Sequence, residues 1–498
     1  MQSHILHKNG AASFACIAVA NTHKMPPSVA LIFWFILLVA LLRFDPARDH
    51  TPSLALWVPV IWMFIIGTRL PSQWLGSQMG QSAQALAEGN PLDRSIDLVL
   101  IVLSIGVLAS RSFKWEGLFA RNMLLLAFVC FSLMSVCWSD FPFITFKRWF
   151  RDIGNYLVIL VVLSDPRPQE AVRIVLRRLS YLLVPLSILL IKYYPELSRQ
   201  YDVWTGAPGY IGAATSKNML GLLCLVCGLF FFWDTCTRWP DRKQRRSKRV
   251  LLVNGAFILM TLWLMNMAHS TTSNVCLFLG CIVITAAHSK VFRKRPGLLK
   301  VMIPAVFCLF LILDIGFDMK GSIAGAVGKD PTLTDRTKIW AFLLGMHTNP
   351  LFGAGYQSFW LGHRLEAFWQ GAGLGHINEA HNGYLEVYLE LGLIGVSLLV
   401  GFLVSSFRAI CRKSGPLSSL AIFGLASWLA LVFYNMTEAA FEGGLLYMVF
   451  LMGAIALPQP AKNRARGAAV IDRPIVTEGS HTPSLESADV RITRFSGR

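Results

Sequence analysis

Charged side chains are scarce in this sequence. Asp, Glu, Lys and Arg make up only 15% of its 498 residues, whereas hydrophobic residues make up 54%. The mean hydropathy of +0.52 excludes a soluble globular protein of this length. About 20 consecutive apolar residues form a helix that crosses the ~30 Å hydrocarbon core of a bilayer. The sequence therefore predicts an all-α, polytopic bundle of transmembrane helices.

Apolar segments separated by polar breaks recur along most of the chain. We identify 13 of them, several of them short, which predicts 12 or 13 membrane spans. The segments are 28–42, 53–68, 95–109, 122–138, 152–164, 179–192, 217–233, 250–268, 274–288, 299–317, 384–407, 417–436 and 443–457. Together they delimit a transmembrane domain over residues 28–457. Residues 1–27 are expected to be a weakly ordered N-terminal segment, and residues 458–498, rich in Pro, Ser, Thr and Arg, a disordered cytoplasmic tail.

Acidic residues are also few: 28 Asp and Glu stand against 46 Lys and Arg, which gives a net charge of +18. The basic residues crowd into alternate loops, chiefly 236–249, 289–300 and 408–413, which predicts that these loops are cytoplasmic. The charge is therefore explained by topology and by contact with anionic lipids, and no nucleic-acid partner is predicted. Alternation then places the following segments on the outer side: 139–149, 193–216, 269–273 and 318–382.

The sequence also lacks the motifs of several common functional sites. Seven of the ten cysteines lie inside apolar segments, so no disulfide framework is expected, and the Cys224–Cys227 pair is interpreted as packing. No Gly-x-Gly-x-x-Gly follows a strand, which argues against a nucleotide-sugar substrate. The histidines of the outer segment lack the spacing of a zinc site, so neither a metal nor another cofactor is predicted. They are His347, His363, His376 and His381.

Several cations occupy positions that the positive-inside preference disfavours. Lys147, Arg148 and Arg151 lie at the outer start of one predicted span, and Lys217 lies at the outer start of another. A cation at a helix N-terminus also opposes the helix dipole, at a cost of about 0.3–1 kcal/mol. A bound anion would offset both effects, because the free N–H groups and the cations would act on it together. The alternative is ordinary contact between these side chains and lipid headgroups.

The outer segment 318–382 is too long to be a simple connection, and it is predicted to contain short helices. Thr334 or Asp335 can cap a helix that runs to about Met346, with Arg336 and Trp340 one turn apart on a shared face. Its apolar face is expected to lie on the membrane domain. This face consists of Ile339, Phe342, Leu343 and Met346.

Polar residues continue from this segment into the next predicted span. His381 lies at the boundary, where an imidazole can accept or hold a proton, and Asn382 or His381 can cap the helix. Glu386 and Glu390 lie one and two turns deeper, and an acid within a span is a candidate functional residue. Gly392 and Gly395 are expected to let another helix approach closely.

This pattern of His-Asn, nine residues and Gly-x-x-Gly resembles the family of O-antigen ligases and bacterial polysaccharide polymerases. Three further stretches are similar to that family and occur in the same order. They are Trp204–Leu220 with Gly206 and the Lys217-Asn218 pair, Thr332–Trp340, and Pro350–Trp360. The Thr-Leu-Thr-Asp-Arg-Thr stretch is closer to exopolysaccharide polymerases than to ligases.

The resemblance implies glycosyl transfer on the periplasmic face of the bacterial inner membrane. The implied donor is a glycan linked to undecaprenyl diphosphate. The implied acceptor is a sugar of another lipid-linked repeat in a polymerase, or of the lipid A core in a ligase. Membrane lipids, and polysaccharide export and chain-length proteins, are further expected partners, and no cofactor or metal is expected.

The resemblance and the misplaced cations together define the candidate site residues. As a hypothesis, Arg336 and His381 are catalytic: Arg336 stabilises charge on the leaving diphosphate, and His381 orients or deprotonates the acceptor hydroxyl. The residues expected to bind the diphosphate are Lys217, Arg148 and Arg151, and the expected supporting residues are Asn218, Trp340, Asn382 and Glu386.

Two other classes of protein fit part of the pattern. A transporter or flippase of lipid-linked sugars would also have many spans and basic residues, but it predicts charged residues deep in several spans and two similar halves. A non-catalytic scaffold of an export complex predicts a patterned tail or a soluble partner domain. The long outer segment favours chemistry on one face over both alternatives.

Overall fold

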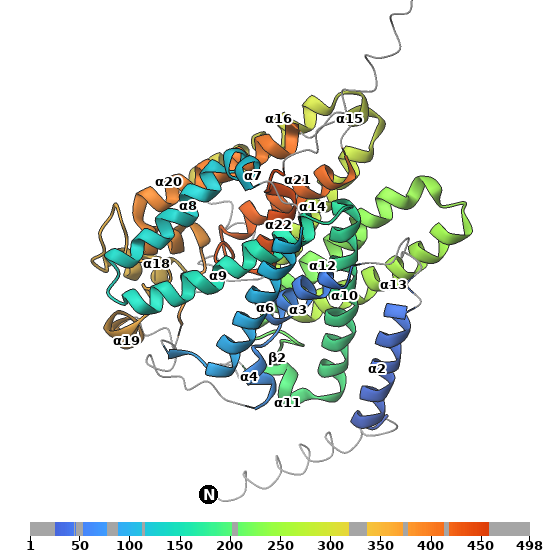
Figure 1. Cartoon of the computed structure of the whole chain (residues 1–498), viewed down its shortest axis with the longest axis horizontal. Helices are drawn as coiled ribbons and strands as arrows, with labels where there is room; N and C mark the ends of the chain where they lie inside the picture. The colour runs from blue at the N-terminus through green and yellow to red at the C-terminus, as the bar shows by residue number, and fades with distance from the viewer. Residues whose placement is uncertain are drawn as a thin grey trace, which may run out of the picture. The chain divides into compact units, whose positions relative to one another are not determined.

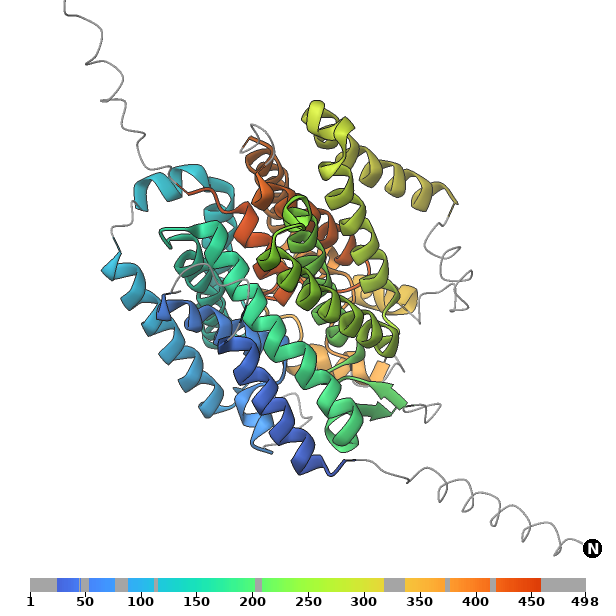
Figure 2. The same cartoon turned by 90° about the vertical axis from the view of Figure 1, so that its right-hand side faces the viewer.

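The computed structural model describes residues 25–43, 45, 53–76, 88–111, 115–201, 208–317, 336–371, 377–412 and 418–457. Regular structure in these residues is almost entirely helical (Figures 1 and 2). Its described strands are one short antiparallel pair, β1 (Arg199–Tyr201) and β2 (Pro208–Tyr210). The predicted all-α class is confirmed. The predicted tail and most of residues 1–27 lie outside the described residues.

A helix overlaps each of the 13 predicted apolar segments. These helices are α2 (Pro27–Arg43), α3 (Trp57–Gly67), α6 (Pro91–Ser110), α8 (Met123–Met134), α9 (Pro142–Leu163), α10 (Pro168–Tyr193), α12 (Lys217–Arg238), α13 (Arg245–Ala268), α14 (Thr271–His288), α16 (Pro296–Phe317), α20 (Gly383–Arg412), α21 (Ser419–Tyr434) and α22 (Leu445–Ala454). The shorter elements are η1 (Leu54–Leu56), α4 (Pro71–Trp74), α7 (Trp115–Arg121), η2 (Ser135–Cys137), α11 (Pro195–Ser198), η3 (Trp239–Asp241), α15 (Lys290–Lys294), α18 (Arg336–Gly345) and α19 (Gly362–Gly371).

Helix length and hydropathy mark this chain as a multi-pass membrane protein. Within the described residues, five helices are long and apolar enough to cross a bilayer: α10, α12, α13, α14 and α20. A sixth span results if α7 and α8, which meet at a bend of 90°, count together. Five further apolar helices have 10–17 residues.

Between Met219 and Trp233, helix α12 is apolar around its whole circumference and lies inside the bundle. It contacts α10, α13 and α14, and α2 lies alongside α10 (Figure 2). Gly221 allows the close approach of α14, because a Cβ atom there would lie 2.5 Å from the Cβ of Ser270. Cys224 and Cys227 are fully buried in this core and are free thiols, which agrees with their interpretation as packing residues.

Helix α20, which lies alongside α8 (Figure 1), is broken at Gly392. Gly392 has a φ of 62° and a ψ of −165°, a conformation that is accessible essentially only to glycine. The loop at residues 350–355 hydrogen-bonds across the break: the Ala354 N–H donates to the Leu389 carbonyl, and the Leu393 N–H donates to the Pro350 carbonyl. The segment that approaches Gly392 is thus this loop and not another helix, so that expectation from the sequence was wrong.

Gly392→Ala is expected to destabilise the protein by about 3 kcal/mol or more. The new Cβ would lie 2.3 Å from backbone atoms of Leu351, in addition to the backbone strain. Thermal unfolding of the detergent-solubilised protein tests this. Gly401→Ala in the same helix is the control, because its Cβ would meet only Leu124 at an ordinary distance of 3.5 Å. Equal unfolding temperatures for the two variants would contradict the assignment of the break.

The polar loop between α16 and α20 builds a small hydrophobic core of its own. Ile339 and Leu343 of α18 are buried against Phe359, Phe368 of α19 and Leu389 of α20. The predicted apolar face of α18 is therefore present, but it packs mainly within this loop unit instead of on the main transmembrane core. The predicted capping residues of α18 lie outside the described residues.

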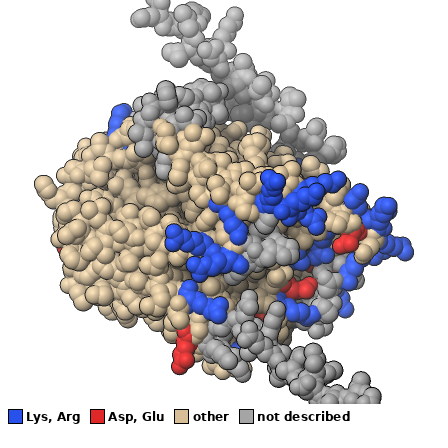
Figure 3. Space-filling model, turned by 90° about the horizontal axis from the view of Figure 1, so that it is seen from above, with Lys and Arg blue, Asp and Glu red and all other residues tan. Residues whose placement is uncertain are grey.

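Basic side chains gather at the C-terminal end of α12. Figure 3 shows a surface region with many Lys and Arg and few Asp and Glu. The loops 239–249 and 289–295 keep all their Lys and Arg side chains exposed. Because α12 begins at Lys217, among the predicted outer segments, and ends at a basic loop, the two ends of the bundle differ in charge.

Candidate functional site

A buried glutamate, Glu438, lies at the centre of a cluster of polar side chains. It follows α21 and accepts a hydrogen bond from the Arg336 guanidinium at 2.6 Å. The Asn218 amide lies 3.1 Å from each of its carboxylate oxygens, and the His381 Nδ1 lies 3.4 Å from one of them. The Glu438 side chain is only 6% exposed. Three residues predicted from separate parts of the sequence therefore meet at one carboxylate.

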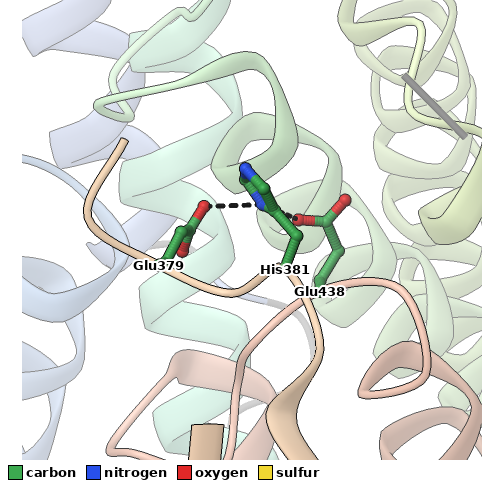
Figure 4. Close-up of side chains that lie close together, drawn as sticks. All are labelled: Glu379, His381 and Glu438. Carbon is green, nitrogen blue, oxygen red and sulfur yellow. Dashed lines mark ion pairs between the residues drawn. The ribbon is translucent and has the colours of Figure 1, made fainter. Parts of the chain in front are cut away.

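His381 lies between two carboxylates, as Figure 4 shows. Its Nδ1 is 2.9 Å from Glu379, and its backbone adopts a left-handed conformation with a φ of 49°. Burial lowers the pKa of His381, but the interactions with Glu379 and Glu438 outweigh burial and raise this pKa to about 9. Burial likewise raises the pKa of Glu438, but His381 and Arg336 bring it below its ordinary value. The cluster at neutral pH therefore combines an imidazolium, the Arg336 guanidinium and the ionised carboxylate of Glu438.

The raised pKa of His381 makes stability depend on pH. Protonation of this ring stabilises the folded state fully below about pH 6.5, progressively less as the pH rises, and not at all above about pH 9. The pKa difference corresponds to a stabilisation on the order of 3 kcal/mol. The unfolding temperature is expected to fall across this pH range in the native protein and much less in His381→Ala. An equal fall in both proteins would contradict the ion pairs of His381.

Helix α18 and the start of α20 hold the His381 segment in place. Trp340, one turn after Arg336, donates its indole N–H to the Ala380 carbonyl at 2.8 Å. Asn382 caps α20, because its side-chain oxygen accepts from the N–H groups of Tyr384 and Leu385 at 3.1 Å each. The predicted cap by Asn382 is therefore present.

Glu386 supports the same segment from one turn inside α20. It is buried, and its two carboxylate oxygens accept hydrogen bonds from the Trp360 indole and from the Ala380 backbone N–H, the latter at 2.8 Å. At the start of the helix, the Gly383 N–H lies 2.9 Å from the carbonyls of Asn435 and Glu438. These contacts tie the His381 segment to the connection between α21 and α22.

The three cations predicted to bind diphosphate do not join the Glu438 cluster. Arg148 of α9 donates to the Gln357 carbonyl at 2.5 Å, and Arg151 lies 3.6 Å from Asp152. Lys217 is exposed at the start of α12, one residue before Asn218. The candidate residues therefore form one group around Glu438 and another at the start of α9.

Two cavities meet at Arg148 and Gln357. The first, which we call the α6–α9 groove, has a volume of about 390 Å³. It is lined by Arg148, Gln357, Lys147 and Arg151, by the acidic residues Glu88, Asp93 and Asp97, and by apolar residues that include Leu98, Ile101, Phe146 and Phe150. The second, which we call the glutamate cavity, has a volume of about 260 Å³. It is lined by Arg148, Gln357, Trp360, Asn378, Glu379, Glu386, Glu390, Ala439 and Glu442.

The glutamate cavity connects the two groups of candidate residues. Arg148 lines one part of it, and Glu379, the partner of His381, lines another. A molecule in this cavity would therefore lie close to both groups. The arrangement provides a groove with apolar, basic and acidic residues, next to a cavity rich in hydrogen-bond acceptors.

Glu379, His381 and Glu438 also have the composition of a metal site. One ligand atom from each lies within 4.8 Å of the others. However, Arg336 already provides a positive charge to Glu438, and the proton on His381 provides a second one. A divalent cation would have to compete with both charges. The prediction that the protein acts without a metal is therefore kept.

Sequence reasoning missed the acidic partners at this site. Glu438 and Glu442 lie in the short polar stretch between the last two predicted spans, and Glu379 lies two residues before His381. A usable signal was the presence of two acids four residues apart in a connection that alternation places on the outer side. Gln357 was missed because it is an uncharged residue in a Gly-rich turn that contains no charged residue.

The fold and the site together define a multi-pass membrane protein with a polar site at one end of its helices. Residues 255–400 match the family model described as O-Antigen ligase. The chain is also 26% identical over 361 residues to "Exopolysaccharide production protein ExoQ" of Rhizobium meliloti (strain 1021), covering 70% of this chain and 80% of that protein.

These matches confirm the resemblance to the family of O-antigen ligases and exopolysaccharide polymerases. They indicate a function in polysaccharide production and an enzyme of the glycosyl-transfer type. The family match contains Arg336, Trp340 and His381, whereas Arg148, Lys217 and Glu438 lie outside it.

Proposed function

We propose that this protein polymerises a cell-surface polysaccharide. It transfers a glycan from undecaprenyl diphosphate to an acceptor sugar at the periplasmic face of the inner membrane. The observation that carries this proposal is the meeting of the α6–α9 groove and the glutamate cavity at Arg148. A transferase needs two substrates side by side, and this junction offers a separate place for each.

The α6–α9 groove suits an amphipathic donor. Its apolar residues, such as Ile101 and Phe150, can contact a polyprenyl chain, and Lys147, Arg148 and Arg151 can bind the diphosphate. Leu98, a groove residue of α6, is 50% exposed, and α6 exposes further large apolar side chains, which suits access from the lipid. A diphosphate at Arg148 would bring the anomeric carbon of the glycan to the mouth of the glutamate cavity.

The chemistry consists mainly of charge stabilisation on the leaving diphosphate. Arg148 and Arg336 are cations on the two sides of the site, and Lys217 is an exposed cation beside Asn218. The protonated His381 can donate a hydrogen bond to a phosphate oxygen or orient the acceptor hydroxyl. Asn218, Trp340, Asn382 and Glu386 hold Glu438 and the His381 segment in position.

The distribution of charge supports the periplasmic orientation. The exposed basic loops 239–249 and 289–295 favour the cytoplasmic side. The Glu438 cluster forms at the start of α12, whereas a basic loop follows its end. The site then faces the side on which no nucleotide sugar is present, in agreement with a lipid-linked donor.

The two names found among similar proteins differ in the acceptor that they suggest. The relative's name refers to exopolysaccharide production and favours a polymerase, whereas the family description refers to a ligase. The two activities share the donor, so the acceptor distinguishes them.

The direct test uses purified protein in lipid vesicles with an undecaprenyl-diphosphate-linked repeat as the only sugar source. A ladder of longer lipid-linked glycans is expected without added nucleotide sugar, and Arg336→Ala is expected to form none. Transfer only to lipid A core oligosaccharide would identify a ligase. Movement of the donor across the vesicle membrane without any transfer would indicate a transporter and refute the proposal.

A further inference from the structure

The glutamate cavity holds acidic residues to which the proposed charge stabilisation gives no role. Four glutamates line it: Glu379, Glu386, Glu390 and Glu442. Three of them have evident structural partners. Glu379 pairs with His381, Glu386 accepts from Trp360 and Ala380, and Glu390 accepts from the Gln357 N–H at 2.7 Å.

Glu442 differs from the other three. Its carboxyl group lies beside that of Glu390 in the cavity. Its Oε1 is buried and has no hydrogen-bond partner among the described residues. A buried carboxylate oxygen without a donor is costly, and a substrate hydroxyl in the cavity would provide that donor.

Transfer requires a group that removes the proton of the acceptor hydroxyl. His381 is poorly suited, because its ion pairs keep the ring protonated at neutral pH and its Nδ1 faces Glu379 and Glu438. Glu438 is engaged by Arg336 and Asn218. Burial raises the pKa of Glu442 to about 7, in the range that favours a general base at neutral pH.

We propose that the glutamate cavity is the acceptor-sugar subsite and that Glu442 accepts the proton of the attacking hydroxyl. This inference rests on the proposed glycosyl transfer and adds the acceptor side to it. Carboxylates, Gln357, Asn378 and the Trp360 indole are suited to the hydroxyl groups and the apolar face of a sugar ring. The cavity volume of about 260 Å³ is suited to a single sugar ring at the growing end and not to a long glycan.

The step balances with the two substrates alone. The O–H bond of the acceptor breaks, and its proton moves to the Oε1 of Glu442. The acceptor oxygen forms a bond to the anomeric carbon, and the bond from that carbon to the diphosphate oxygen breaks. The electron pair leaves with the diphosphate beside Arg148, and the proton on Glu442 then passes to water.

Glu442→Gln preserves the shape of the side chain and removes the base. Its transfer rate is expected to fall by about 10²–10⁴-fold, while the affinity for the lipid-linked donor changes by less than about 3-fold. Glu442→Asp is expected to retain intermediate activity, because it keeps a carboxylate. Glu366→Gln, an exposed glutamate of α19 outside both cavities, is the matched control and should transfer at the native rate.

Chemical rescue separates a proton acceptor from a structural residue. Formate added to Glu442→Ala is expected to raise transfer by about 10-fold or more, because a small carboxylate can occupy the vacated space. Native-like transfer by Glu442→Gln, or a loss in Glu442→Ala that formate does not reverse, would overturn the inference. Native protein that transfers nothing from the donor would overturn the proposed function instead.

Discussion

Glu438→Gln is expected to lower the rate of glycosyl transfer by about 10²–10³-fold. Arg336, His381 and Asn218 all contact this carboxylate, so its neutralisation leaves a half-buried guanidinium without its anionic partner. Initial rates of polymer formation in vesicles measure the effect.

The same substitution has a second, independent readout. His381 would lose its interaction with the Glu438 carboxylate and keep only that with Glu379, so the pKa of His381 is expected to fall from about 9 towards its ordinary value. NMR titration of the imidazole follows this change. A Glu438→Gln variant with native transfer and an unchanged His381 pKa would show that Glu438 does not organise the site.

Arg148→Ala is expected to have a comparably large effect, because Arg148 lines both cavities. Loss of a charge-assisted contact to the diphosphate should weaken donor affinity by about 10–100-fold. Loss of charge stabilisation during transfer should lower the maximal rate by about 10²-fold. Donor binding and single-turnover transfer, measured on the same preparation, separate the two effects.

Two variants sharpen the interpretation of Arg148. Arg148→Lys keeps the charge but not the planar fork of donors, so partial activity is expected. Arg245→Ala, at the exposed start of α13 and at the other end of the bundle, removes the same kind of charge and should leave donor affinity unchanged. Equal losses in Arg148→Ala and Arg245→Ala would indicate a general effect of charge and not a site at Arg148.

The helices were predictable because burial in lipid demands long apolar segments, and each of the 13 segments overlaps a helix. The break in α20 was not predictable, because no proline marks it and the apolar pattern continues after Gly392. The break depends on hydrogen bonds with a loop about 40 residues earlier in the chain. Pairing between such distant segments leaves no local signature in one sequence.

The candidate site was predictable only in part, because some of its residues carry a local signal in the sequence and others do not. Arg336, His381 and Asn218 stood out by motif, and Arg148 by a charge in an unexpected place. Glu438 had neither signal, since an acid in a short polar connection is usually solvated. Only the fold shows that this connection closes over the start of α20.

The roles of the cations could not be separated from the sequence either. Arg148 and Arg336 are both basic residues near predicted outer boundaries, which suggested one diphosphate site. In the structure, Arg336 pairs with Glu438, whereas Arg148 lines the junction of two cavities. The assignment of the donor to the α6–α9 groove depends on this difference.

Photocrosslinking of the donor tests the central claim most directly. A benzophenone amino acid replaces Leu98, which lines the α6–α9 groove, or Leu259 of α13, which is 70% exposed and lies outside that groove. Irradiation with a labelled polyprenyl-diphosphate glycan is expected to label the Leu98 variant, with competition by unlabelled donor, and not the Leu259 variant. Equal labelling at both positions, or labelling at Leu98 that excess donor does not reduce, would contradict a donor site at Arg148.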